Sequence, residues 1–154
     1  MECACSVKFY IRQIFLSLLK KAIRYVKKLI EEGTKEIVIL HVIDEHELVM
    51  MIEGCGWLGK DPAECLDEIE KKHREMAEKE LNKIKKKLMS EEVKVKTQIE
   101  KGTPFKKIVE IAEREKVSLI VMGSHGKGVL KELLIGSVSE NVVRHTKKPV
   151  LIIR

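Results

Sequence analysis

The 154-residue sequence lacks the features that mark membrane and exported proteins. No uncharged apolar run approaches the ~20 residues that a membrane-spanning helix needs, which excludes a transmembrane protein. The apolar run at residues 14–19 follows Lys8 and Arg12, but it is short and continues directly into Lys20 and Lys21. It also has no small-residue cleavage site, so no signal peptide is predicted. We therefore expect a cytoplasmic protein.

Cysteine is also scarce. The chain has four cysteines, at positions 3, 5, 55 and 65, which are too few for a fold built on disulfides at this length. No Cys-x-x-Cys pair occurs, and the spacing of Cys3, Cys5, Cys55 and Cys65 does not match a zinc site. We expect reduced thiols with no metal or redox role.

Aromatic residues make up only 4% of the chain, and no single charge sign dominates. The net charge of +6 comes from 30 basic and 24 acidic residues. A basic balance can indicate nucleic-acid binding, but both signs alternate along the predicted helices and few rings are available to stack on bases. Nucleic-acid binding is therefore not expected. The length and the 44% apolar content favour one folded domain spanning residues 1–154.

What the sequence does contain is a regular alternation of apolar, β-branched runs with amphipathic helical patterns. Such alternation predicts a doubly wound α/β protein with a parallel sheet covered on both faces. Ligands of such sheets bind beyond the carboxyl ends of the strands, where the strand order reverses. Strands are predicted at 35–43, 93–99, 117–122 and 149–153, and helices at 15–32, 62–89, 104–115 and 137–146.

Capping residues define two of these helices. Thr103 followed by Pro104 predicts an N-cap with proline at the first helical position. Ser137 and Glu140 fit a capping box at the start of the last helix. Residues 44–61 form the longest stretch predicted to be irregular, either a lid with the apolar residues Met50, Met51 and Trp57 or a plain packing excursion.

The five histidines give no metal-binding spacing. His73 falls on the apolar stripe of the 62–89 helix, together with Met76, and His41 lies within a predicted buried strand. Both are predicted to pack in the core. His46 and His145 fall at expected loops or helix ends.

A glycine-rich segment follows the strand that ends at Met122 and precedes the last helix, with the sequence VMGSHGKGVLKELLIGSVSENVV. Glycines let a backbone approach an anion closely, and successive N–H groups with a helix N-terminus attract phosphate. The segment is not a P-loop, and Lys131 stands where a dinucleotide fingerprint needs its third glycine.

Gly123-x-x-Gly126, nine residues and then Gly136-Ser137 resemble the G-2x-G-9x-G-[S/T] nucleotide-binding motif of the universal stress protein family. The segments ILHVID, LIVMGSHGKG and GSVSENVVRHTKKPVLIIR resemble its second strand, its fourth strand and loop, and its last helix and strand. The resemblance covers residues 20–154. It implies an adenine nucleotide alpha hydrolase-like, three-layer sandwich with helices on both faces of an open five-stranded parallel sheet in order 3-2-1-4-5.

The resemblance also implies a function. Such a protein is a small stress-response regulatory module that binds ATP, with Mg or Mn held through the phosphates, and forms a homodimer through its last strand, here residues 150–153. We find no nucleophile–base pair, so hydrolysis is expected to be slow at most and no catalytic or metal-ligating residue is assigned. By position, Gly126, Gly136, Ser137, Val138 and Ser139 hold the triphosphate, Gly123 holds the ribose, and the backbone of Val42 faces adenine, with Met122 and Lys127 completing the set.

The beginning of the chain departs from the family pattern. Family members follow the first strand with a Pro-Thr-Asp-like turn whose aspartate lies at the nucleotide. Here a degenerate strand at 6–11 is followed by Arg12, Gln13 and Ile14, with Ile14 at the aspartate position. Two interpretations remain open: the protein has lost a polar contact and binds nucleotide weakly or not at all, or the natural N-terminus differs from residues 1–20. The first favours an alternative function, a nucleotide-independent dimeric interaction protein of the same fold. Arg12 offers an alternative partner for phosphate.

Overall fold

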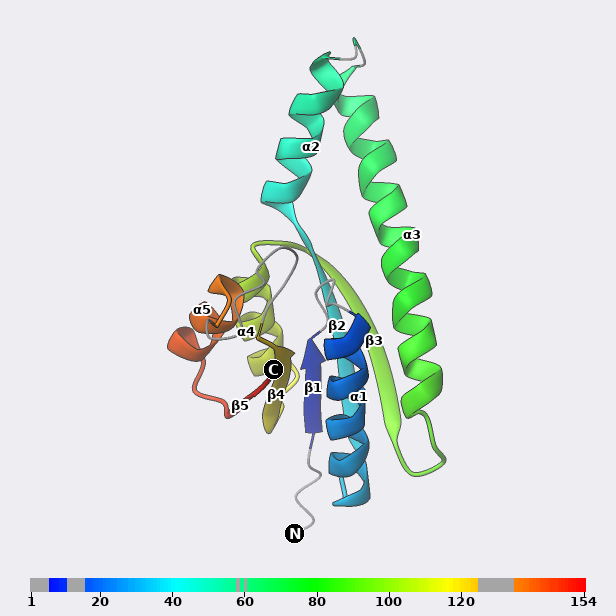
Figure 1. The fold of residues 1–154 in the computed structure, drawn as a ribbon, viewed down its shortest axis with the longest axis vertical. Helices are drawn as coiled ribbons and strands as arrows, with labels where there is room; N and C mark the ends of the chain where they lie inside the picture. Colours follow the sequence, from blue (N-terminus) through cyan, green and yellow to red (C-terminus); the bar gives the residue numbers. More distant parts are fainter. Residues whose placement is uncertain (1–5, 11–15, 58, 60, 125–134) are drawn as a thin grey trace.

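The computed structural model describes residues 6–10, 16–57, 59, 61–124 and 135–154. Five strands form one parallel sheet in the order β3-β2-β1-β4-β5 (Figure 1), which is the order that the resemblance implied. Each strand lies within a few residues of its predicted position, including the weakly patterned first one, which the resemblance placed at 6–11. The strands are β1 (Ser6–Tyr10), β2 (Glu36–Asp44), β3 (Lys94–Gly102), β4 (Leu119–Gly123) and β5 (Val150–Ile153).

Helices cover the two faces of the sheet, with α1 and α3 on one face and α4 and α5 on the other (Figure 1). Alternate residues of β2 enter two separate apolar clusters: Ile37 and Ile39 pack on the side of α1 and α3, whereas Leu40 and Val42 pack on the side of α4. A strand buried on both faces explains why the β2 sequence is apolar throughout. The helices are α1 (Leu16–Glu31), α2 (Glu45–Trp57), α3 (Pro62–Leu88), α4 (Pro104–Arg114) and α5 (Ser137–His145).

The first strand lies at the centre of the sheet. Val7 pairs with Ile37 of β2 on one side and with Leu119 of β4 on the other. In the sheet, β2 and β3 follow one another on one side of β1, and β4 and β5 follow one another on the other side. The strand order therefore reverses between β1 and β4, and a ligand site is expected at the carboxyl ends of these strands.

The segment predicted to be irregular at 44–61 is largely the helix α2, so that prediction was wrong. Asp44 accepts a hydrogen bond from the backbone N–H of His46 (3.1 Å), and Glu45 and Glu47 stand in the first turn, where the helix dipole favours acidic groups. Leu48 and Cys55 are spaced so that both face α3. Glycines at 54 and 56 obscured this pattern in the sequence.

Helices α2 and α3 form an antiparallel hairpin that projects beyond the carboxyl edge of the sheet (Figure 1). The Asp61 carboxylate caps α3 by accepting from the backbone N–H groups of Ala63 (2.9 Å) and Glu64 (3.1 Å). Cys55 and Cys65 are joined in a disulfide across the hairpin, which corrects the expectation of reduced thiols. The spacing of ten residues hid this pairing, because only the turn between the helices brings the two cysteines together.

No helix in the described ranges is both long and apolar enough to cross a membrane.

Candidate functional site

The end of β4 and the start of α5 are fastened together at the carboxyl edge of the sheet. The backbone N–H of Ser124 donates to the carbonyl of Ile153 (2.8 Å), which extends the pairing of β4 with β5 by one residue. The N–H of Gly136 then donates to the carbonyl of Ser124 (2.7 Å). The chain therefore leaves the sheet at Ser124 and returns to the same point at Gly136. The intervening predicted site residues Gly126 and Lys127 lie outside the described residues.

The N-terminus of α5 begins with backbone groups rather than with a capping side chain. Gly136 is the N-cap, with φ −68° and ψ 155°, and it has no side chain to cap the helix. The first intrahelical bond runs from Glu140 N–H to the Gly136 carbonyl (2.9 Å). The N–H groups of residues 137–139 consequently have no partner within the helix. An anion placed there would meet these donors and the positive end of the helix dipole.

The capping box predicted at Ser137 and Glu140 is absent, which corrects that prediction. Ser137 is the first helical residue and is exposed, and Glu140 forms an ion pair with Arg144 (2.8 Å). Ser139 instead carries the structural hydroxyl: it is buried and donates to the carbonyl of Gly123 (2.9 Å). This bond ties α5 to the last residue of β4 and fixes the helix terminus over the sheet edge.

The other predicted site residues lie around the same edge. Val42 and Met122 are buried, with side chains in the apolar cluster on the α4 face, so only their backbone can face a ligand. Val42 pairs with Glu100 of β3. The β1–β2 register ends at Tyr10 opposite Leu40, so no described residue of β1 pairs with Val42. Val138 is half-buried against this cluster.

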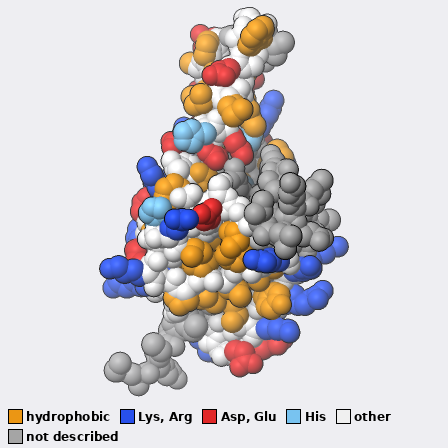
Figure 2. Space-filling model, turned by 60° about the vertical axis from the view of Figure 1, so that its left-hand side comes forward, with side chains coloured by type: hydrophobic (Ala, Val, Ile, Leu, Met, Phe, Trp, Pro, Cys, Tyr) orange, Lys and Arg blue, Asp and Glu red, His pale blue; other side chains and the backbone are white. Residues whose placement is uncertain are grey.

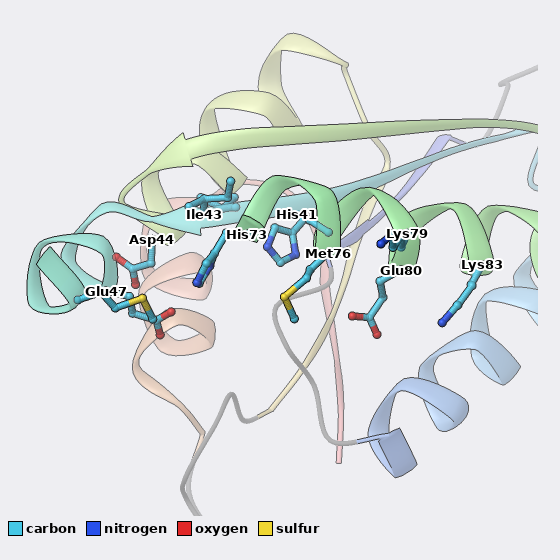
Figure 3. Close-up of a pocket in the computed structure, with 12 residues that line it drawn as sticks. His41, Ile43, Asp44, Glu47, His73, Met76, Lys79, Glu80 and Lys83 are labelled. Carbon is cyan, nitrogen blue, oxygen red and sulfur yellow. The ribbon is translucent and has the colours of Figure 1, made fainter. Parts of the chain in front are cut away.

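A pocket of about 520 Å³ lies between the end of β2, the start of α2 and the middle and C-terminal part of α3 (Figure 3). From β2 it is lined by His41, Val42 and Ile43, and from α2 by Glu47 and Met51. From α3, His73, Met76 and Glu80 contribute, and Figure 3 shows His41 and His73 side by side at its wall.

The predicted environment of the two histidines of this pocket was wrong. His41 and His73 were predicted to pack in the core, but both are only partly buried, and Met76 is 60% exposed. The cause is the pocket itself: His41 and His73 both line it, so neither side chain is enclosed on all sides. Among the described residues, no group of three or more His, Cys, Asp or Glu could hold a metal ion.

These features define a class of protein: a doubly wound α/β protein whose last helix begins at a glycine, at the carboxyl edge of the sheet where the strand order reverses. The family model for universal stress proteins matches residues 16–154, and the chain belongs to the universal stress protein family. The region that matches the family model begins at the first residue of α1.

Individual relatives agree with this assignment. The chain is 41% identical over 138 residues to universal stress protein MJ0577 of Methanocaldococcus jannaschii, covering 86% of this chain and 85% of that protein. The solved structure of MJ0577 superimposes with a TM-score of 0.80 at 37% identity, covering 97% and 95% of the two chains.

Two further relatives are more distant. Universal stress protein YxiE of Bacillus subtilis is 34% identical over 134 residues, covering 87% of this chain and 89% of that protein. A universal stress protein of Archaeoglobus fulgidus, solved in complex with dAMP, shares the fold at 15% identity with a TM-score of 0.59, covering 97% and 98% of the chains.

Proposed function

We propose that this universal stress protein binds ATP at the carboxyl edge of its sheet and acts as a small dimeric regulatory module in the stress response. The observation that carries the proposal is the N-terminus of α5, which begins at a glycine and is fastened to the end of β4 by the Ser124–Gly136 and Ser139–Gly123 bonds. The complex of the Archaeoglobus fulgidus relative with dAMP supports an adenine nucleotide as the ligand.

Each candidate residue has a proposed role. The backbone N–H groups of residues 137–139 bind the phosphates, since the Ser139 hydroxyl is already engaged with Gly123, and Gly136, whose own N–H is bonded to Ser124, lets the phosphates approach closely. Gly123 and Met122 lie against the ribose, and the backbone of Val42 faces adenine beside the pocket at the end of β2. Gly126 and Lys127 complete the phosphate site.

The proposed cation enters with the nucleotide. Mg²⁺ or Mn²⁺ is held by the phosphates, because magnesium keeps several waters and is commonly bound through substrate phosphates. We expect any ATP hydrolysis to be slow, since the described residues at this edge contain no nucleophile–base pair.

We also propose a homodimer formed through β5. This strand is the last in the sheet order, and its residues Val150, Leu151 and Ile152 are half-buried. Figure 2 shows apolar side chains gathered on the side of the molecule that carries α5 and β5 in Figure 1. An apolar edge strand needs a cover. Light scattering after gel filtration is expected to give twice the 17.7 kDa chain mass, whereas the mass of one chain would contradict the dimer.

Calorimetric titration with ATP and magnesium tests the nucleotide proposal, with AMP as the comparison. We expect micromolar binding of ATP that weakens sharply for AMP. Gly136→Val is expected to abolish it, because the backbone at φ −68° and ψ 155° accepts valine while the added methyl groups block the approach of phosphate. Gly56→Val is the matched control, since a Cβ at Gly56 meets open space at the far end of the hairpin. Equal affinity in Gly136→Val and the control would contradict the site.

The second candidate is a nucleotide-independent dimeric interaction protein. The observation that favours it is Ile14, which stands where family members that bind ATP carry an aspartate. A folded dimer that gives no heat with ATP would select this function over the first.

A further inference from the structure

We propose that the Cys55–Cys65 pair is a redox modification site, and that its state controls the order of α2 and of the pocket wall that α2 forms. The proposal is independent of nucleotide binding, since it concerns the hairpin and is tested without nucleotide. It rests on how α2 is anchored.

The disulfide lies in the seam of the hairpin. It joins the last turn of α2 to the first turn of α3, with a Cα–Cα distance of 6.5 Å that falls within the range for disulfides. Both cysteines are buried, with 8% of Cys55 and 4% of Cys65 exposed. Cys65 is held in place because Asp61 caps α3 and the Cys65 N–H donates to the Asp61 carbonyl (3.0 Å). The α3 side of the bond is therefore fixed.

The α2 side depends on the bond. Leu48 and Cys55 are the only residues of α2 that are buried, and Ile52 between them is partly buried, so a narrow apolar seam and the disulfide near its end hold the helix against α3. Gly54 and Gly56 flank Cys55, and each glycine weakens a helix relative to alanine. Trp57, at the end of α2, is 92% exposed and adds no packing. Without the bond, the last turn of α2 has almost nothing to hold it.

The consequence reaches the pocket at the end of β2. Glu47 and Met51 of α2 line this pocket together with His73 and Met76 of α3. Loss of order that begins at residue 57 and proceeds toward Met51 removes the wall that α2 forms. The oxidised protein holds the pocket closed on this side, and the reduced protein opens it.

The exchange is ordinary thiol–disulfide chemistry. A thiolate of dithiothreitol attacks the sulfur of Cys55, which is the more exposed of the two, and Cys65 leaves as a thiolate that takes a proton from water. The second thiolate of dithiothreitol then releases Cys55, so the protein gains two electrons and two protons and the reagent becomes a cyclic disulfide. Oxidised glutathione drives the reverse reaction and is itself reduced to two thiols.

Hydrogen exchange of the full chain tests the proposal, in a Cys3→Ser/Cys5→Ser background so that only one pair can react. After treatment with oxidised glutathione, we expect the two thiols to disappear and no glutathione adduct to remain. On reduction, the amides of residues 49–57 are expected to exchange at least about tenfold faster, because the cross-link no longer restricts the open state. The amides of α4 serve as the internal reference and are expected to keep their rates.

Two variants separate the bond from the fold of the hairpin. Cys55→Ser under oxidising conditions is expected to exchange like the reduced protein. Gly54→Ala/Gly56→Ala is expected to make the reduced form exchange more slowly, since a Cβ at either position meets open space. Persistence of two free thiols after oxidation, or equal exchange of α2 in both states, would overturn the proposal.

Discussion

The sheet with its covering helices and the α2–α3 hairpin are held together in different ways. Ile37, Ile39 and Leu40 of β2 are fully buried between two layers of helices. In contrast, α2 buries two of its thirteen residues and exposes Val49, Met50 and Trp57. The sheet is therefore stabilised by packing that no single contact dominates, whereas α2 depends on a few identifiable contacts. The proposed nucleotide site is built on the first kind of structure and the redox site on the second.

The largest expected difference in the free energy of unfolding is between truncation of a side chain in the sheet core and truncation of an exposed side chain of α2. Ile39→Ala in the core is expected to lower the free energy of unfolding by about 2–5 kcal/mol, because it leaves a cavity between α1, α3 and the sheet. Val49→Ala on the exposed side of α2 is expected to change it by less than about 0.5 kcal/mol. Denaturant unfolding of both variants measures the difference, and equal losses would contradict the distinction between the regions.

The next largest effect on stability is expected at the hydrogen bond that joins α5 to the end of β4. Ser139→Ala removes the hydroxyl that donates to the Gly123 carbonyl and leaves a buried acceptor without this partner, at an expected cost of about 1–3 kcal/mol. Ser137→Ala, two residues earlier and exposed, is the matched control and is expected to be nearly neutral. The same unfolding experiment distinguishes them. A neutral Ser139→Ala would show that this bond does not hold the helix terminus in place.

Glycine substitutions test whether the glycines of α2 limit the stability of the hairpin. Gly54→Ala is expected to stabilise the protein by about 0.5–1 kcal/mol, since its backbone is helical and its surroundings are open. Gly33→Ala is the contrasting control, because Gly33 ends α1 at φ 102°, where alanine is strained. Melting temperatures are expected to rise for the first variant and fall for the second. A fall for Gly54→Ala would mean that α2 is not limited by its glycines.

The smallest predicted effect is a pH dependence at the outer strand. The hydrogen bond and charge of Glu36 at 2.6 Å, with a further contribution from Glu115, raise the pKa of Lys96 above its ordinary value of 10.5. A raised pKa in the folded state means that the contribution is fully present below about pH 10.5 and is lost as the pH rises through the folded value. The stability difference between wild type and Lys96→Met is expected to be small, constant up to that pH and smaller above it. A difference that grows with pH would contradict the assignment.

The sheet could be predicted from the sequence because parallel strands that are buried on both faces appear as nearly continuous apolar runs. Residues 37–43 and 119–122 are apolar at every position except His41, and their alternation with helices determines the architecture. The glycine spacing around Gly123 and Gly136 likewise located the corner between β4 and α5. These features are local in the chain and are read from short segments.

The hairpin could not be predicted in the same way. Glycines at 54 and 56 masked the helical spacing of Leu48 and Cys55, and the pairing of Cys55 with Cys65 depends on the angle between two helices. His41 and His73 were assigned to the core because the sequence does not show the pocket between β2 and α3 that both residues line. The role of Ser139, rather than Ser137, depends on the carbonyl of Gly123 coming within 2.9 Å, which is a tertiary contact.

Hydrogen exchange of the full-length protein with and without ATP and magnesium tests the central claim most directly. The account predicts slower exchange at residues 122–124 and 136–139, where the end of β4 meets α5, with no protection at the far end of the hairpin around residues 54–57. Protection confined to the hairpin, or no protection at a saturating ATP concentration, would contradict it.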